Sequence, residues 1–143
     1  MVDIGGQEKI DIVLVTFQRL HLLKITIKAI NLRTKYPYRL IVVDNNSSDG
    51  TKEWLLKAMH KKLIDEVIFM SRNIGLGKGF QKGLERVRSE YFVTCTDDLI
   101  PPKLNPCWLT QEVKTIKEHP NHAGIAMRGC RISRFDKLDK ELQ

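Results

Sequence analysis

The chain has 143 residues, of which 42% are hydrophobic and 29% are charged, a composition typical of a soluble globular domain and unlike that of disordered, collagen-like or coiled-coil chains. No apolar run approaches the ~20 residues that span a bilayer, and the N-terminus has no signal-peptide pattern, so we expect a cytoplasmic protein, with a membrane-associated partner as an open alternative. A net charge of +7 favours anionic partners, but the basic residues are scattered along the chain, which argues against a nucleic-acid groove.

Strand and helix patterns alternate from Ile10 to Arg128. The expected strands are residues 10–16, 39–44, 66–70, 91–96 and 123–128. Helical spacing follows in residues 20–30, 51–63 (with Leu55, Met59 and Leu63 facing the core), 80–87 and 109–119. Apolar strands separated by helices predict an α/β fold: a single Rossmann-like domain with a mainly parallel sheet and helices on both faces. We expect residues 1–128 to form this domain and residues 129–143 to form a polar tail without a packing partner.

Polar residues follow each expected strand, at the edge where parallel sheets bind ligands. Among them, Asp97 and Asp98 lie next to each other at the end of an apolar strand. Adjacent carboxylates repel each other, and a divalent cation would neutralise them. The alternative is a purely local role, in which these aspartates form an Asx-turn or cap a helix before Pro101.

A glycine-rich segment, Gly75-Leu76-Gly77-Lys78-Gly79, precedes the third helix. Its backbone N–H groups and the charge of Lys78 could hold a phosphate, although the spacing matches neither common phosphate-binding loop. Glycines at a helix entry also allow close packing against a neighbouring element, and this alternative stays open.

Three segments together resemble the GT-A glycosyltransferases of family 2, over about residues 10–128. They are IDIVLVTFQR, YRLIVVDNNSSDGT and SRNIGLGKGFQKGLERVRSEYFVTCTDDLIPP, in this order. The resemblance implies an inverting, hexosyltransferase-like enzyme that uses a nucleoside-diphosphate sugar, with a UDP-sugar favoured. The residues it implies for nucleotide binding are Thr16, Phe17, Arg19, Asp44, Asn45, Arg72, Asn73, Lys78 and Asp97.

The same resemblance implies that Asp98 binds Mg²⁺ or Mn²⁺, with Thr96 standing where the family's DxD motif begins. It supplies no catalytic base: Asp136, Asp139 and Glu141 are carboxylates in the tail to which we assign no role. We therefore expect the chain to bind a donor nucleotide but to transfer sugar poorly. The alternative function is a non-catalytic nucleotide-binding or interaction module, and the sugar, the base, the acceptor and the oligomeric state are not determined by the sequence.

Overall fold

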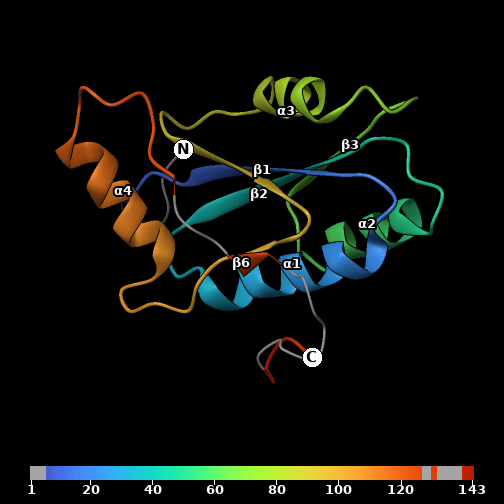
Figure 1. The fold of residues 1–143 in the computed structure, drawn as a ribbon, viewed down its shortest axis with the longest axis horizontal. Coiled ribbons are helices and arrows are strands. Elements are labelled where there is room, and N and C mark those ends of the chain that lie inside the picture. Colours follow the sequence, from blue (N-terminus) through green and yellow to red (C-terminus); the bar gives the residue numbers. More distant parts are fainter. Residues whose placement is uncertain (1–5, 127–129, 132–139) are drawn as a thin grey trace.

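The structure is a computed structural model that describes residues 6–126, 130–131 and 140–143 (Figure 1). Its centre is a parallel sheet of four strands in the order β3-β2-β1-β4. The strands are β1 (Ile10–Thr16), β2 (Tyr38–Asp44), β3 (Glu66–Phe69) and β4 (Phe92–Thr96). Thr16 is paired with Asp44, and Val15 with Thr96, so three carboxyl ends meet at one edge.

Helices cover both faces of this sheet, as the sequence predicts. They are α1 (Leu20–Arg33), α2 (Thr51–His60), α3 (Leu76–Leu84) and α4 (Trp108–Glu118). In β1, Ile12 and Leu14 pack against α1, α2 and α4, whereas Val13 and Val15 on the other face pack against α3. Because side chains alternate along a strand, every residue of β1 is buried by one layer or the other.

The strand order explains which helices share a face. The chain steps in one direction from β1 to β2 to β3 and then returns across β1 to β4. Parallel crossovers are almost always right-handed, so α1 and α2 lie on one face and α3 lies on the other, as Figure 1 shows.

Two expectations about the C-terminal part are wrong. Residues 123–126 form no strand, while residues 127–128 of that expected strand lie outside the described residues. Instead β5 (Leu99–Ile100) pairs antiparallel with β6 (Cys130–Arg131). The end of the tail also has packing partners: Leu142 is buried with Ile25, Ala29 and Ile100, and Glu141 pairs with Arg33 at 2.9 Å.

The inward orientation expected for Met59 and Leu63 is also wrong, because both side chains are 39% exposed. The buried stripe of α2 is Thr51, Leu55 and Ala58. The helix ends at His60, and Lys62 has a left-handed backbone with φ 59°, so Leu63 no longer follows the helical spacing. None of the described helices is long and apolar enough to cross a membrane.

Candidate nucleotide-binding site

Two loops at the carboxyl edge are tied together by side chains that sequence analysis did not single out. The Gln18 backbone N–H donates to Ser47 Oγ at 2.9 Å, and the Gln18 side chain exchanges hydrogen bonds with Ser48. Asp49 accepts from the backbone N–H of Leu20 and from that of Thr51, which start α1 and α2. An aspartate two residues before Thr51 is a recognisable signal for a local turn at the start of α2, but nothing local indicates its contact with α1.

Asp97 is the buried centre of the site. It is 4% exposed. Its Oδ2 accepts a hydrogen bond of 2.7 Å from Thr16 Oγ1. Burial raises the pKa of Asp97 above its usual value, although the bond from Thr16 and the charge of Arg19 oppose that effect. The backbone carbonyl of Asp97 also accepts from Thr26 Oγ1, which anchors this position to α1.

Arg19 bridges the two adjacent carboxylates. Its Nη1 lies 3.4 Å from Asp97 Oδ1 and 3.5 Å from Asp98 Oδ2. Asp98 Oδ1 accepts a 2.7 Å hydrogen bond from Thr96 Oγ1. The side-chain partners of Asp97 therefore come from β1 and the loop after it, which argues against a purely local Asx-turn for this residue.

Asp44 and Asn45 are at the carboxyl edge of the sheet, but their side chains are covered by neighbouring loops rather than exposed to solvent. Both are buried, and the Asp44 carboxylate accepts from the backbone N–H of Ser47. Burial raises the pKa of Asp44, an effect that the hydrogen bonds from Ser47 oppose. Asn45 donates to the carbonyl of Gly75 and accepts from the N–H of Ile74, so its side chain holds the loop before α3.

Phe17, Arg72, Asn73 and Lys78 are exposed. Asn73 Oδ1 accepts from the backbone N–H of Gly75 at 2.9 Å, forming a local turn. The two cations and the aromatic ring are therefore open to a ligand, while Asn73 supports the shape of its own loop.

The glycine-rich segment is mostly helix rather than loop, because α3 begins at Leu76. A Cβ atom at Gly79 would lie 2.9 Å from Val15 Cγ1, whereas one at Gly77 would meet nothing within 4 Å. Close packing of α3 against β1, the alternative to phosphate binding, therefore accounts for the glycine at position 79. Among the three glycines of this segment, only Gly75, with φ 85°, has the positive φ that favours glycine.

The donor set at this edge fits a metal that is shared with a phosphate. Within the described part of the chain, no group of three or more His, Cys, Asp or Glu side chains is placed to bind a metal. Asp98 supplies one carboxylate, next to the more deeply buried carboxylate of Asp97. Mg²⁺ is commonly held by one or two carboxylates together with substrate phosphates and water, so these residues fit such an ion.

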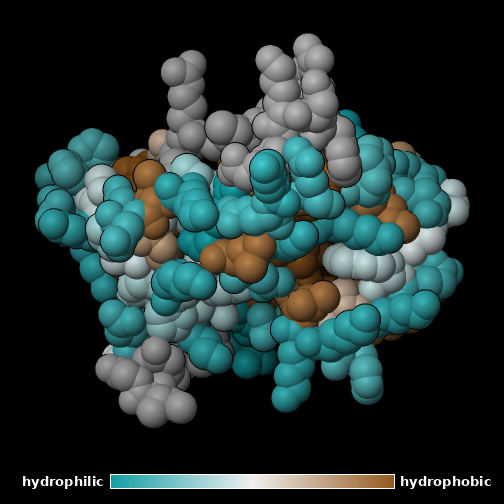
Figure 2. Space-filling view, turned by 90° about the horizontal axis from the view of Figure 1, so that it is seen from below, coloured by the Kyte–Doolittle hydropathy of each residue, from teal (hydrophilic) through white to brown (hydrophobic). Residues whose placement is uncertain are grey.

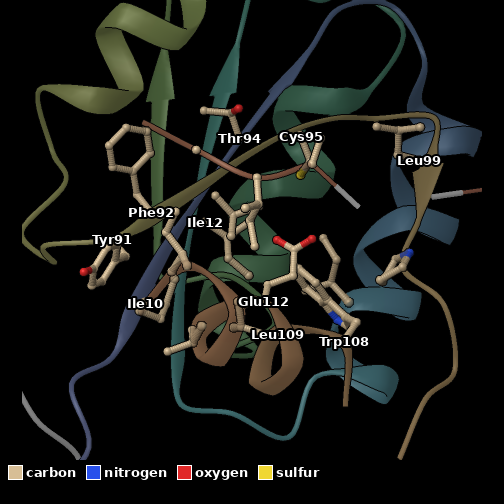
Figure 3. A pocket seen from close by; sticks show the side chains of 18 of the residues that line it. Ile10, Ile12, Tyr91, Phe92, Thr94, Cys95, Leu99, Trp108, Leu109 and Glu112 are labelled. Carbon is tan, nitrogen blue, oxygen red and sulfur yellow. The ribbon is translucent and has the colours of Figure 1, made fainter. Parts of the chain in front are cut away.

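A cavity of about 750 Å³ lies elsewhere, beside β4 and α4 (Figure 3). Apolar side chains dominate its wall, including Ile12, Trp108 and Leu109, and the Glu112 carboxylate points into it. Burial raises the pKa of Glu112, and it raises the pKa of the Cys95 thiol to about 12. The cavity contains none of the residues that sequence analysis assigned to the nucleotide.

A comparison with models of protein families identifies the family of this chain. The model of the family described as glycosyl transferase family 2 matches residues 11–140. The chain belongs to this family. No curated protein matched the sequence.

Solved structures of GT-A glycosyltransferases have the same fold. One is the mannosyltransferase PcManGT from Pyrobaculum calidifontis in complex with GDP-Man and Mn²⁺ (TM-score 0.67, 19% identity, 76% of this chain and 32% of that chain). Another is S. aureus TarS 1–349 in complex with UDP-GlcNAc (TM-score 0.66, 18% identity, 84% of this chain and 37% of that chain). A third is glucosyl-3-phosphoglycerate synthase from Mycobacterium tuberculosis with Mn²⁺, UDP and glucosyl-3-phosphoglycerate (TM-score 0.55, 22% identity, 73% of this chain and 39% of that chain). The chain thus spans about a third of the length of these proteins, and the GT-A expectation is confirmed.

Proposed function

We propose that this chain binds a nucleoside-diphosphate sugar together with Mg²⁺ or Mn²⁺ at the edge that contains Arg19, Asp97 and Asp98. Family membership supports a glycosyltransferase role. The ligands of the similar structures, UDP-GlcNAc, UDP with Mn²⁺ and GDP-Man with Mn²⁺, support the ligand class. We favour a UDP-sugar as donor and an inverting transfer to an acceptor hydroxyl.

The observation that carries the proposal is the position of the Arg19 guanidinium between two carboxylates. Asp97 and Asp98 directly follow β4, and their side chains are 5% and 13% exposed. Neighbouring negative charges repel each other, and the Arg19 guanidinium offsets that repulsion. Arg19 is 52% exposed and comes from a loop, so it can leave this position when a metal ion supplies the charge.

Each site residue has a distinct role in this proposal. Asp98 would hold the metal, and Asp97, fixed by Thr16, would face the ribose. Arg72 and Lys78 are exposed cations that would attract the diphosphate. When bound, the metal would offset negative charge on the leaving nucleoside diphosphate.

No residue is assigned as the base that deprotonates the acceptor. Glu141 is paired with Arg33 and Lys103, and Asp136 and Asp139 lie outside the described residues. A positioned base typically contributes about 10²- to 10⁴-fold to the rate. We therefore expect donor binding by this chain without efficient transfer.

The test compares UDP and GDP binding with and without Mn²⁺, by calorimetry and thermal unfolding. A ligand at about 100 times its Kd should stabilise the fold by about 2.7 kcal/mol. We expect this stabilisation to require Mn²⁺ in the wild type and to lose its Mn²⁺ dependence in Asp98→Ala, because that substitution removes the metal ligand.

Glu118→Ala is the matched control, since Glu118 is an exposed carboxylate on α4. It should bind nucleotide and Mn²⁺ as the wild type does. Equal Mn²⁺-dependent affinity in Asp98→Ala and the wild type would contradict the metal assignment. Absence of any nucleotide binding by the wild type would favour the interaction-module alternative.

A further inference from the structure

The net charge of the chain lies in residues 20–35 and 51–63, whose exposed side chains we define as the α1–α2 surface. Of the 24 basic and 17 acidic residues in the chain, eight basic and one acidic lie in these two segments. The rest of the chain carries sixteen of each and is neutral. These two segments therefore carry the whole charge of +7, of which the exposed lysines and Glu53 supply +6 and the buried Arg33 supplies +1.

Most of this charge is accessible. Seven of the eight basic residues are exposed lysines, namely Lys24, Lys28, Lys35, Lys52, Lys57, Lys61 and Lys62. The eighth, Arg33, is buried and paired with Glu141. None of these lysines forms an ion pair with any carboxylate in the described ranges 6–126 and 140–143. Lys52 Nζ lies over the Phe69 ring, 5.5 Å from its centroid, and the charge of the other six lysines is available to an external partner.

Large aliphatic side chains project from the same surface. Leu32, Leu56, Met59 and Leu63 are 45%, 46%, 39% and 39% exposed. The Asn31 side chain donates to the Leu63 carbonyl at 3.1 Å, which joins the end of α1 to the segment after α2. Figure 2, which faces the side of the molecule on which α1 and α2 lie in Figure 1, shows hydrophobic groups set among hydrophilic ones.

We propose that the α1–α2 surface docks this protein on a bilayer that contains anionic lipids. Lysines are attracted to acidic headgroups, and exposed aliphatic side chains can enter the boundary between headgroups and acyl chains. The alternative anionic partner, single-stranded RNA, is usually bound by aromatic side chains that stack on bases. The exposed Phe17 and Phe92 lie outside this surface, so its chemistry fits a lipid surface better.

Docking in this way leaves the candidate nucleotide site open. The α1–α2 surface is the outer side of a helical layer, whereas Arg19, Asp97 and Asp98 lie at the carboxyl ends of the strands. The docking proposal therefore does not depend on the nucleotide proposal. An experiment that contradicts the docking proposal would not contradict the nucleotide proposal, and the reverse also holds.

The test is sedimentation of the full chain with vesicles of phosphatidylcholine alone and of phosphatidylcholine mixed with phosphatidylglycerol. We expect binding to the mixed vesicles only. Raising the ionic strength from about 0.1 M to about 1 M shortens the Debye length from about 10 Å to about 3 Å and should release most of the protein. Equal binding to both vesicle types, or no binding to either, would overturn the proposal.

Variants with equal net charge distinguish the effect of this particular surface on vesicle binding from the effect of the overall charge of the protein. Removing two surface lysines should weaken binding about 30-fold, so the Lys61→Glu/Lys62→Glu variant should lose at least that much. The Lys114→Glu/Lys117→Glu variant has the same net charge but changes exposed lysines of α4, and it should bind almost as the wild type does. Equal losses in the two variants would show that overall charge alone is responsible, and would overturn the proposal.

A second pair of variants tests the aliphatic contribution. Leu56→Ser/Met59→Ser should weaken vesicle binding, whereas Leu104→Ser, at a residue that is exposed outside this surface, should not. Circular dichroism checks that each variant is folded. Lys24→Glu/Lys28→Glu on α1 replaces Lys61→Glu/Lys62→Glu if that variant is not folded, and Leu32→Ser replaces Leu56→Ser/Met59→Ser in the same case. Tight binding of a short single-stranded RNA that the Lys61→Glu/Lys62→Glu variant loses, with unchanged vesicle binding, would assign the surface to RNA instead.

Discussion

Gly83 lies where helix α3 approaches the sheet most closely. A Cβ atom built on Gly83 would lie 2.2 Å from Val13 Cγ1 and 3.2 Å from Val43 Cγ2. Val13 and Val43 are fully buried within their strands, so neither side chain can move aside without disturbing the sheet. Gly77 belongs to the same helix but has open space around it. A side chain is therefore excluded by close packing at Gly83 and sterically permitted at Gly77.

We expect Gly83→Ala to destabilise the fold by about 1–3 kcal/mol, the usual cost of overpacking a core. Gly77→Ala is the matched control and should stabilise the fold by about 0.5–1 kcal/mol, because alanine favours a helix. Urea unfolding of both variants measures these changes. If Gly83→Ala were as stable as Gly77→Ala, α3 would not pack this closely on β1.

Among the secondary-structure elements, the start of β1 is joined to its neighbours by one buried carboxylate. Asp11 accepts from Arg39 Nε of β2 at 2.7 Å and from the backbone N–H groups of Arg88 and Ser89 at 2.6 and 3.1 Å. The Asp11 side chain is fully buried, and the Arg39 side chain is 11% exposed. Asp11 therefore links β1, β2 and the segment that leads into β4.

Burial alone would raise the pKa of Asp11, but the hydrogen bonds from Arg39, Arg88 and Ser89 outweigh burial and lower it. The stability from Asp11 is therefore complete above the unfolded-state pKa of about 3.9 and is lost as the pH falls through the lower folded-state value. We expect Asp11→Asn to cost about 3–5 kcal/mol at neutral pH, because it leaves Arg39 without its buried partner. The difference should shrink in acid.

Urea unfolding at neutral pH and below about pH 3.9 measures this effect. Glu85→Gln is the control, because the Lys82–Glu85 pair is exposed and such pairs contribute at most about 1 kcal/mol. A pH-independent cost for Asp11→Asn would mean that lost packing, rather than lost charge, explains the destabilisation.

For the whole molecule, the end of the chain returns to the surface of α1. Leu142 is buried with Ile25, Ala29 and Ile100. Arg33 joins this contact to the site, because it binds both Glu141 and the carbonyl of Pro101, three residues after Asp98. Residues 141–142 therefore support the segment that follows the two aspartates.

We expect Leu142→Ala to lower the stability by about 2–5 kcal/mol, the usual range for a buried leucine. Leu104→Ala, at an exposed position, should change it by less than about 0.5 kcal/mol. Urea unfolding compares the two. Equal stability of these variants would support the expectation of a tail that does not pack.

Much of the fold was predictable from local patterns. The runs at residues 10–16 and 66–70 are apolar and bounded by turn residues, and the structure has strands there within one residue. Asp97 and Asp98 were predictable candidates because they end such a run. Their partners Thr16 and Arg19 were candidates through the family resemblance, but contacts such as Gln18 with Ser48 were not, because they join loops about 30 residues apart in sequence.

The sequence by itself therefore determined the order of strands and helices and the polar edge at which the strands end, since both follow from periodicity within short segments. Only the tertiary structure decided the spatial order β3-β2-β1-β4, and with it the face on which each helix lies. Right-handed crossovers then placed α1 and α2 side by side, so that lysines scattered along the sequence became one charged surface. The same order brought Val13 against Gly83, a contact that depends on how closely α3 crosses β1 and not on any pattern within either element.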